Sequence, residues 1–185
     1  MLTKKEASVC YGQISRLPMG KQTHRGVMKV FIRRITERDL GNLQAWSDAI
    51  GSQAYMEKVS PQSFNGSDLS GWGDDYVWFI ITADGRDVGG VWVERRRWDS
   101  VQGTLGIIIG DPTLLGHGIG RRAIDLATRE ARFIMGIDHV RLTVRTSNLR
   151  AIRAYQSCGF AVTGSATLRT ADGTPIPFYR MEEVR

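Results

Sequence analysis

The stretch "DPTLLGHGIGRRAID", residues 111–125, decides the fold, because a glycine-rich loop leads directly into a run with helical spacing. Gly116, Gly118 and Gly120 occupy alternate positions at the start of this run. The apolar and small residues that follow recur at helical intervals, which predicts a helix over 119–134 that packs closely on a sheet. A strand, a glycine loop and a helix N-terminus in this order suit a phosphate-bearing ligand, since free backbone N–H groups and the helix dipole both favour an anion.

Two arginines in the predicted first turn of this helix strengthen the case for an anion. A cation near a helix N-terminus is disfavoured by about 0.3–1 kcal/mol unless an anion binds there, and Arg121 and Arg122 both occupy such positions. A tight turn with solvated arginines is the alternative that the loop alone leaves open. Gly116 lacks the spacing and the lysine of a P-loop, and the G-x-G-x-G pattern differs from the G-x-G-x-x-G of a dinucleotide fold.

Outward from the loop, the apolar pattern predicts one continuous fold. Thr36 and Asp39 form a capping-box-like start to the first helix, and the glycine- and serine-rich segment 49–75 reads as a loop or short helix that could line a site. We expect strands over 28–35, 76–84, 88–98, 103–110, 139–144, 160–170 and 176–184, helices over 36–50, 119–134 and 147–159, and turns at 83–87 and 99–103. The three consecutive strands form an antiparallel meander. The predicted class is α/β (α+β), a mixed, mostly antiparallel central sheet of about six to seven strands flanked by helices.

Length and charge limit the function classes. The 185 residues suit one domain, which we place at 28–185 after a basic, flexible extension over 1–27. The extension carries a net charge of +4 of the total +6, so the rest is nearly balanced and nucleic acid is an improbable partner. We expect no membrane span and a cytoplasmic protein in which Cys10 and Cys158 are reduced thiols.

A second motif stands in "SNLRAIRAYQSCGF", residues 147–160. Its pattern is N-x-x-A-x-x-x-Y-x-x-x-G-F, formed by Asn148, Ala151, Tyr155, Gly159 and Phe160. Taken singly, Asn148 is explained as a helix cap, and Tyr155 as the end of an apolar stripe that begins with Leu149 and Ile152 and faces the core.

Together the two motifs resemble the GNAT superfamily of acetyl-CoA-dependent N-acetyltransferases, over most of residues 28–185. "LLGHGIG" is similar to the Q/R-x-x-G-x-G/A loop of that family, with Leu115 where Gln or Arg is usual and His117 where Lys or Arg is common. The resemblance implies acetyl-CoA or coenzyme A as cosubstrate and no metal. The cofactor-binding residues that it implies are Ile108, Ile109, Gly110, Leu115, Gly116, His117, Gly118, Ile119, Gly120, Arg121 and Asn148.

The same resemblance assigns roles. The loop would bind the pyrophosphate through backbone amides, residues 108–110 would pair with the pantetheine arm, and Asn148 would hydrogen-bond that arm. Tyr155 would protonate the leaving thiolate, and a backbone N–H near Ile109 would polarise the carbonyl. Since histidine is charged only in mild acid, acetyl-CoA should bind more tightly at pH 6 than at pH 8 if His117 faces the phosphates.

The general base is less clear, because the strand over 103–110 carries no carboxylate. Glu94 on the neighbouring strand is the first candidate, Asp111 the second and an ordered water the third. The alternative is that Glu94 has no catalytic role and is a surface carboxylate among neighbouring arginines. A weak base suits an α-amine better than a lysine-like amine, because an α-amine loses its proton more readily.

The acceptor stays open: a protein N-terminus or a small-molecule amine, since the chain resembles both aminoglycoside 6′-type and ribosomal-protein N-terminal acetyltransferases. Asp74 and Asp75 beside Trp72 could form a local acidic, aromatic pocket. Two rival functions remain: a catalytically weak CoA- or nucleotide-binding module, and an NAD(P)-dependent oxidoreductase. The scattered histidines predict no metal site, and a homodimer is possible.

Overall fold

The computed structural model describes residues 28–49, 59–66, 68–96, 99–169 and 173–184, so the predicted extension over 1–27 lies outside the described residues. The elements are β1 (Val30–Arg34), the 3-10 helix η1 (Glu37–Asp39), α1 (Leu40–Ala49), β2 (Tyr76–Ala83), β3 (Arg86–Arg96), β4 (Asp99–Ile109), the 3-10 helix η3 (Pro112–Leu114), α2 (Ile119–Met135), β5 (His139–Arg145), α3 (Leu149–Ser157), β6 (Phe160–Arg169) and β7 (Pro175–Glu183).

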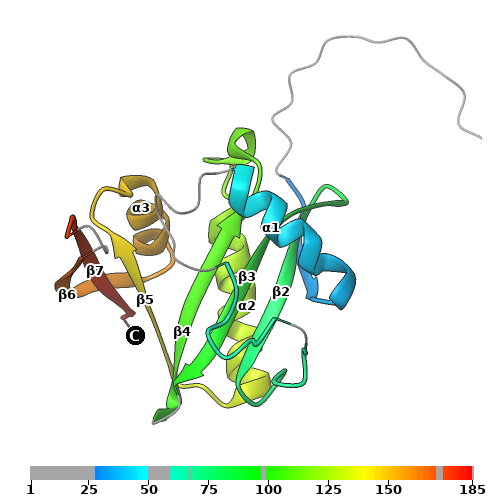
Figure 1. Cartoon of the computed structure of the whole chain (residues 1–185), viewed down its shortest axis with the longest axis horizontal. Coiled ribbons are helices and arrows are strands. Elements are labelled where there is room, and N and C mark those ends of the chain that lie inside the picture. Colours follow the sequence, from blue (N-terminus) through cyan, green and yellow to red (C-terminus); the bar gives the residue numbers. More distant parts are fainter. Residues whose placement is uncertain (1–27, 50–58, 67, 97–98, 170–172, 185) are drawn as a thin grey trace, which may run out of the picture.

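The strands form one seven-stranded sheet in the order β1-β2-β3-β4-β5-β7-β6 (Figure 1). Only β4 and β5 are parallel, and the other neighbours run antiparallel. The parallel pair is connected through α2, as a crossover between parallel strands requires. This arrangement confirms the predicted class of a mixed, mostly antiparallel sheet flanked by helices.

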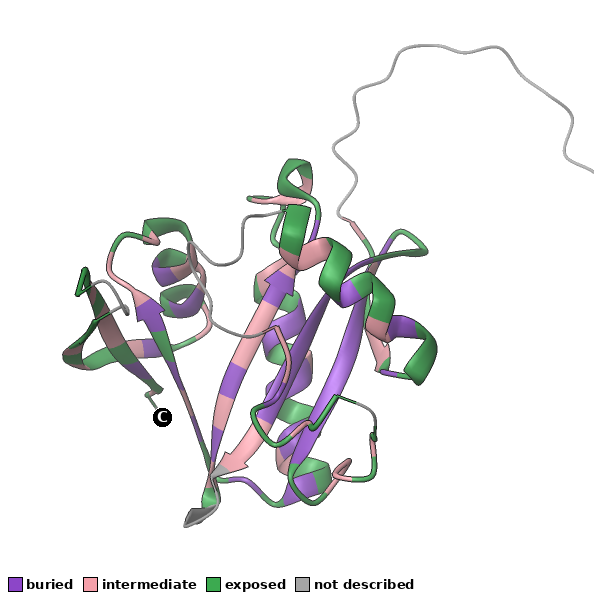
Figure 2. Cartoon of the chain, viewed as in Figure 1, coloured by how far each residue is buried: buried purple, intermediate pink, exposed green. Residues whose placement is uncertain are grey.

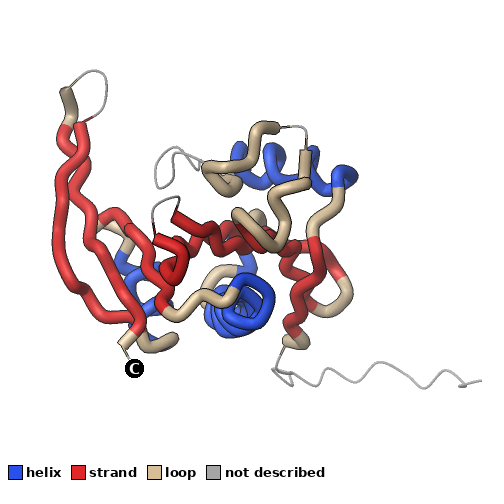
Figure 3. Tube along the Cα trace, turned by 90° about the horizontal axis from the view of Figure 1, so that it is seen from below, coloured by secondary structure: helices blue, strands red, loops and turns tan. Residues whose placement is uncertain are grey.

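Helix α2 covers one face of the sheet and α1 the other (Figure 3). The small residues of α2 allow close packing, because Ala123, Ala127 and Ala131 are all fully buried against the apolar side chains of the central strands. On the α1 face, a second and more aromatic cluster centres on Trp78 and Trp92. Figure 2 shows strands β2 and β3 buried along most of their length, whereas the β6–β7 hairpin is largely exposed.

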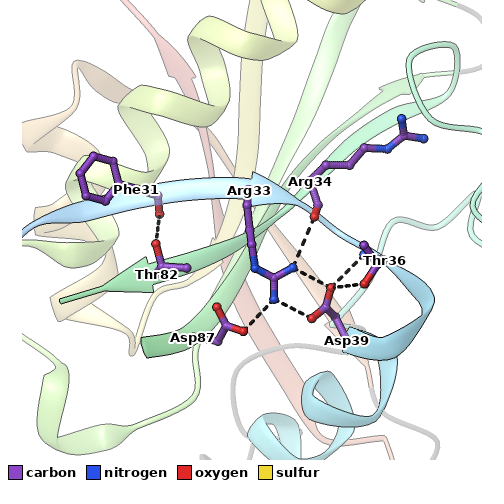
Figure 4. Close-up of polar contacts among 7 residues, drawn as sticks. All are labelled: Phe31, Arg33, Arg34, Thr36, Asp39, Thr82 and Asp87. Carbon is purple, nitrogen blue, oxygen red and sulfur yellow. Dashed lines mark hydrogen bonds and ion pairs between the residues drawn. The ribbon is translucent and has the colours of Figure 1, made fainter. Parts of the chain in front are cut away.

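The start of the first helix is fixed by a network of charges (Figure 4). The carboxylate of Asp39 accepts the Thr36 backbone N–H at 2.8 Å, which confirms the predicted capping box. Arg33 donates to both oxygens of Asp39, at 2.9 and 2.7 Å, and to Asp87 at 2.7 Å. Strand β1, helix η1 and the start of β3 are thereby held together.

Three local predictions were wrong. Residues 99–102 are strand and not turn, because β4 pairs with Arg96 of β3 from Asp99 onward and with His139 of β5 at Gln102. Helix α2 extends one residue beyond its predicted end at 134, and Met135 is buried against the sheet whereas Ile134 is exposed. Leu149 is exposed, because it is the first residue of α3 and lies outside the apolar face formed by Ile152 and Tyr155.

Within the described ranges, no helix combines the length and the apolar character that crossing a membrane would need.

Candidate functional site

A cleft opens where β4 and β5 separate. The two strands pair at only three positions, the last of which joins Thr104 to Arg141. Beyond that point they diverge toward their C-terminal ends (Figure 1). The resulting cleft has a volume of about 650 Å³ and is bounded by β4, the glycine loop, the first turn of α2 and one face of α3. The two sequence motifs therefore meet across a single opening in the sheet.

The backbone of β4 on the open side of this cleft has no strand beside it. The Gly110 N–H donates to the Val88 carbonyl at 2.8 Å, so the even-numbered residues of β4 direct their backbone groups toward β3. Leu105, Ile107 and Ile109 direct theirs to the opposite side, where β5 has diverged. An extended ligand can pair with these groups as an added strand would.

The glycine loop presents its backbone to the same cleft. Gly116 and Gly118 have φ values of +85° and +79°, a left-handed backbone conformation that residues with a Cβ rarely adopt. Gly118 is the N-cap of α2 and provides no side chain to cap the helix. The first hydrogen bond of α2 runs from the Arg122 N–H to the Gly118 carbonyl at 3.1 Å.

The backbone amides between the start of the glycine loop and this first helical hydrogen bond have no hydrogen-bond partner in the described backbone. Among the described residues, no backbone acceptor is found for the N–H groups of residues 116–121. Such amides at the positive end of a long helix form an anion site that needs no basic side chain. An anion site of this kind would not depend on the side chain of Leu115, which stands where Gln or Arg is usual.

Most of the predicted site residues lie together in the cleft, although their roles remain predictions. Those that line it are Ile108, Ile109, Leu115, Gly116, Gly118, Ile119, Gly120, Arg121, Asn148 and Tyr155. The predicted backbone pairing of Ile108 with an extended ligand is wrong, because the backbone groups of Ile108 face Gly90 of β3.

Two predicted cofactor residues lie elsewhere. Gly110 is buried beneath Trp46, whose ring would lie 2.1 Å from a Cβ at this position. His117 lines a second hollow of about 700 Å³ between β1, α2 and the end of α3. Arg121 contributes to both spaces.

Tyr155 lies in the last turn of α3, where it is buried and lines the cleft. Its ring packs edge-on against Phe160, with ring centroids 6.2 Å apart. Burial raises the pKa of Tyr155 to about 12, with a smaller contribution from Cys158. The hydroxyl therefore keeps its proton at neutral pH and can donate it.

Asn148 caps α3 as predicted, and it also lines the cleft. It is the N-cap of α3, and its side-chain oxygen accepts the Ala151 N–H at 3.2 Å. The side-chain carbonyl is therefore occupied, which leaves the amide N–H groups as the donors available to a ligand. Since Asn148 also lines the cleft, capping and ligand binding are compatible in this residue.

The two candidate bases have structural partners and do not line the cleft. Glu94 is half-buried on β3, and its carboxylate accepts the backbone N–H of Gln62. Asp111 caps η3 by accepting the backbone N–H and the hydroxyl of Thr113, at 2.8 and 2.6 Å. These hydrogen bonds lower the pKa of Asp111, the one from the Thr113 hydroxyl most, which makes this carboxylate a weaker base. The assignment of Glu94 stays a prediction.

The proposed acidic, aromatic pocket at Trp72 is already engaged by a cation. The Arg34 guanidinium carbon lies 4.4 Å from the Trp72 ring centroid, and the same ring packs edge-on with Phe79. An amine ligand would have to displace Arg34 to reach this ring.

The cleft also includes residues that the sequence analysis did not single out. Thr143 on β5 and the α3 residues Arg150 and Arg153 line it. The helical spacing of Arg150, Arg153 and Ser157 offered a signal, because these positions recur on one side of α3. No local signal marks Thr143, whose position depends on the separation of β5 from β4.

Comparison with known proteins agrees with this geometry. The chain matches the acetyltransferase (GNAT) family over residues 43–160. A spermidine N-acetyltransferase from Vibrio cholerae, solved with CoA and spermine, has a TM-score of 0.66 at 19% identity over 83% of this chain and 94% of that chain. The aminoglycoside acetyltransferase AAC(6')-Ib, in complex with coenzyme A, has a TM-score of 0.65 at 19% identity over 85% of this chain and 95% of that chain.

Similarity also extends to an archaeon. An uncharacterized protein of Methanocaldococcus jannaschii is 30% identical in a 142-residue match that covers 73% of this chain and 28% of the relative. A domain from the same organism, solved by crystallography, has a TM-score of 0.60 at 24% identity over 84% of this chain and 99% of that chain. The chain thus spans 28% of the length of the curated relative that it matches.

Proposed function

The chain belongs to the GNAT family of acetyltransferases, and from this premise we propose that it transfers an acetyl group from acetyl-CoA directly to a primary amine. The observation that carries the proposal is the opening between β4 and β5, which brings unpaired strand amides, the loop amides and Tyr155 into one cleft. The acceptor is an amine of a protein N-terminus or of a small molecule, and the setting that we propose is the cytoplasm.

The residues present fit coenzyme A. The amides of residues 116–121 suit the pyrophosphate, and the open backbone edge of β4 suits the amide groups of the pantetheine arm. The amide group of Asn148 can donate to the same arm. Acetyl-CoA supplies the activated acetyl group when it is bound.

The chemistry that remains for the protein is proton transfer and polarisation. As the amine nitrogen bonds to the acetyl carbon, the carbon–sulfur bond breaks and its electron pair leaves with the sulfur. Tyr155 gives the sulfur a proton, and the Ile109 N–H stabilises negative charge on the carbonyl oxygen. The attacking nitrogen loses a proton to a base, for which we propose Glu94 acting through water.

The raised pKa of Tyr155 is compatible with this role. Burial disfavours the charged form of any acid, so a thiolate in the same cleft also becomes more basic than it is in water. Phenol and thiol therefore shift in the same direction, so burial alone does not widen the difference between their pKa values.

The test is thiol release from acetyl-CoA with aminoglycosides, polyamines, amino acids and short peptides with free N-termini as acceptors. Tyr155→Phe should lower kcat about 100-fold and leave acetyl-CoA affinity within about twofold, because only the proton donor is lost. Tyr179→Phe is the matched control, since Tyr179 packs on the same core but lies on β7 and does not line the cleft. Equal rates in wild type and Tyr155→Phe would remove the acid assignment.

Two further outcomes concern the enzyme itself. CoA binding without turnover on any acceptor would favour the CoA-binding module. If calorimetry detects no CoA binding, the interpretation of the glycine loop is wrong.

A further inference from the structure

Arginines from two helices line the cleft between β4 and β5. Among the described residues that line it, the charged ones are Arg121 on α2 and Arg150 and Arg153 on α3. All three side chains are exposed, and in the described part of the chain none of them forms an ion pair. The cleft therefore presents positive charge that no described carboxylate neutralises.

The two arginines of α3 are unfavourable for the helix that bears them. Arg150 lies in the first turn, where the positive end of the helix dipole disfavours a cation, and this turn contains no acidic residue. Arg153 lies three residues further along, so the two like charges are neighbours on the helix surface and repel each other. An anion bound between the two guanidinium groups would offset both effects.

The glycine loop and the start of α3 offer an anion different groups. The amides of residues 116–121 have no backbone acceptor in the described chain, and they suit the pyrophosphate of coenzyme A. In the first turn of α3, by contrast, the Leu149 and Ala151 N–H groups already have acceptors within the chain, at 3.0 and 3.2 Å. An anion beside α3 therefore depends mainly on the side chains of Arg150 and Arg153.

The arginines of α3 lie close to the pyrophosphate site. The sulfur of Cys158, directly after α3, contacts the Arg121 carbonyl at 3.7 Å, so the end of α3 meets the first turn of α2. Ser157, at this junction, lines the cleft together with Arg153 and Arg150. The positive wall thus begins beside the loop amides and continues along α3.

We infer that Arg150 and Arg153 bind the 3′-phosphate of coenzyme A, so that the protein selects coenzyme A over dephospho-coenzyme A; this inference rests on the proposed acetyl transfer. Coenzyme A has its third phosphate on the ribose, a few bonds from the pyrophosphate, and dephospho-coenzyme A lacks only this group. Arginines bind phosphate through charge-assisted hydrogen bonds, and two arginines from successive turns can donate to different oxygens of one phosphate.

The test is calorimetry with the two cofactors, because their adenine, pyrophosphate and pantetheine arm are the same. The wild type should bind coenzyme A about tenfold more tightly than dephospho-coenzyme A. Adenosine 3′-phosphate 5′-diphosphate and ADP repeat the comparison without the pantetheine arm, and the same ratio is expected. The readout is an affinity ratio, so it does not require the acceptor to be known.

Variants locate the effect. Arg150→Gln and Arg153→Gln should each lower the affinity ratio several-fold, and the double variant should bring it to about one. Affinity for dephospho-coenzyme A should stay within about twofold of wild type, since both side chains are exposed and the loop amides are intact. Arg129→Gln is the matched control, because Arg129 is exposed on α2 and does not line the cleft. Arg122→Gln tests the second hollow, which Arg122 lines.

Equal affinities of the wild type for the two cofactors would overturn the inference, and so would a tenfold ratio that survives the double variant. A ratio that is lost in Arg122→Gln and kept in the double variant would place the 3′-phosphate in the second hollow instead. In each of these cases the cofactors still bind, so the proposed function is not contradicted. A wild type that binds neither cofactor would overturn the proposed function and this inference with it.

Discussion

Two helical segments of this chain begin in opposite ways. At η1 the carboxylate of Asp39 accepts the Thr36 N–H and is itself bound by Arg33, so the chain satisfies its own donors and charges. At α2 the cap is Gly118, which has no side chain, and the preceding amides have no backbone partner among the described residues. Every helix N-terminus leaves such amides, and of these two starts the second is the one that leaves them without a backbone partner among the described residues.

The difference teaches where mutations should act. We call the start of η1 closed, because side chains of the protein satisfy it, and the start of α2 open. A change at the closed start removes contacts that hold the fold, so it should lower stability and leave ligand affinity intact. A change at the open start should affect ligand affinity beyond its effect on stability, since nothing in the chain completes it. The predictions below test this separation.

Gly118→Val should have the largest effect, a loss of acetyl-CoA affinity of about 100-fold. Gly118 has a φ of +79°, where a β-branched residue is strained by roughly 1–3 kcal/mol, so the loop must move and its amides with it. Gly136→Val is the matched control, because Gly136 has a φ of +63° at the other end of α2 and a Cβ meets no atom at either site. Calorimetry gives the affinity and urea unfolding the stability.

Both valine variants should lose comparable stability, and only Gly118→Val should lose affinity. An equal loss of affinity in Gly136→Val would mean that strain anywhere in α2 is transmitted to the site. The comparison of an open with a closed helix start would then lose its meaning.

Asp39→Asn should lower the free energy of unfolding by about 2 kcal/mol at pH 7. The hydrogen bond from Arg33, and to a lesser extent those from Thr36, lower the pKa of Asp39 from 3.8 to about 2, and the side chain is only 7% exposed. Since the folded pKa is the lower one, this stability is fully present above about pH 4 and is lost as the pH falls toward 2. Urea unfolding from pH 7 to pH 2 measures it.

The matched control is Asp125→Asn, which breaks the exposed pair with Arg122 on α2 and should cost less than about 0.5 kcal/mol. Acetyl-CoA affinity should stay within twofold of wild type in Asp39→Asn. A marked loss of affinity there would show that the closed start also shapes the site.

The fold could be predicted from the sequence wherever the pattern is local. Apolar runs bounded by turn-like residues marked the meander, because its strands are buried on both faces, and alanine spacing marked α2, which is buried on one face. The start of β4 at Asp99 could not be predicted from a polar run, since it depends on the pairing of Asp99 with Arg96 of β3 and of Gln102 with His139, which is distant in sequence. A polar "DSVQG" run looks like a turn until that partner is in place.

The same limit applies to the site. The glycine loop is a local motif, so its open amides follow from the residues themselves. The contact between Glu94 and the Gln62 N–H and the position of Thr143 at the opening both arise from chain segments far apart. No spacing rule in one sequence encodes such a juxtaposition.

A smaller effect is expected at the start of α3, which is intermediate between the two cases because Asn148 both caps the helix and lines the cleft. Asn148→Ala should cost about 1 kcal/mol of stability and raise the KM of acetyl-CoA several-fold. Asn148→Asp keeps a capping oxygen and removes the amide donors, so it should retain stability and still raise that KM. Steady-state kinetics and thermal unfolding separate the two. If Asn148→Asp keeps the wild-type KM for acetyl-CoA, the side chain of Asn148 caps the helix and does not bind the ligand.

The smallest effect is expected at His117. The backbone of this residue belongs to the loop beside the cleft, whereas its side chain lines the hollow beside β1. Histidine gains charge in mild acid, so a side chain facing the phosphates would tighten acetyl-CoA binding at pH 6 relative to pH 8. From its position we expect His117→Ala to bind acetyl-CoA within about twofold of wild type at both pH values. The opposite outcome is a wild-type affinity for acetyl-CoA that rises clearly at pH 6, with the rise lost in His117→Ala. It would show that the imidazole turns toward the phosphates when the ligand binds. The open start of α2 would then use a side chain as well as its amides.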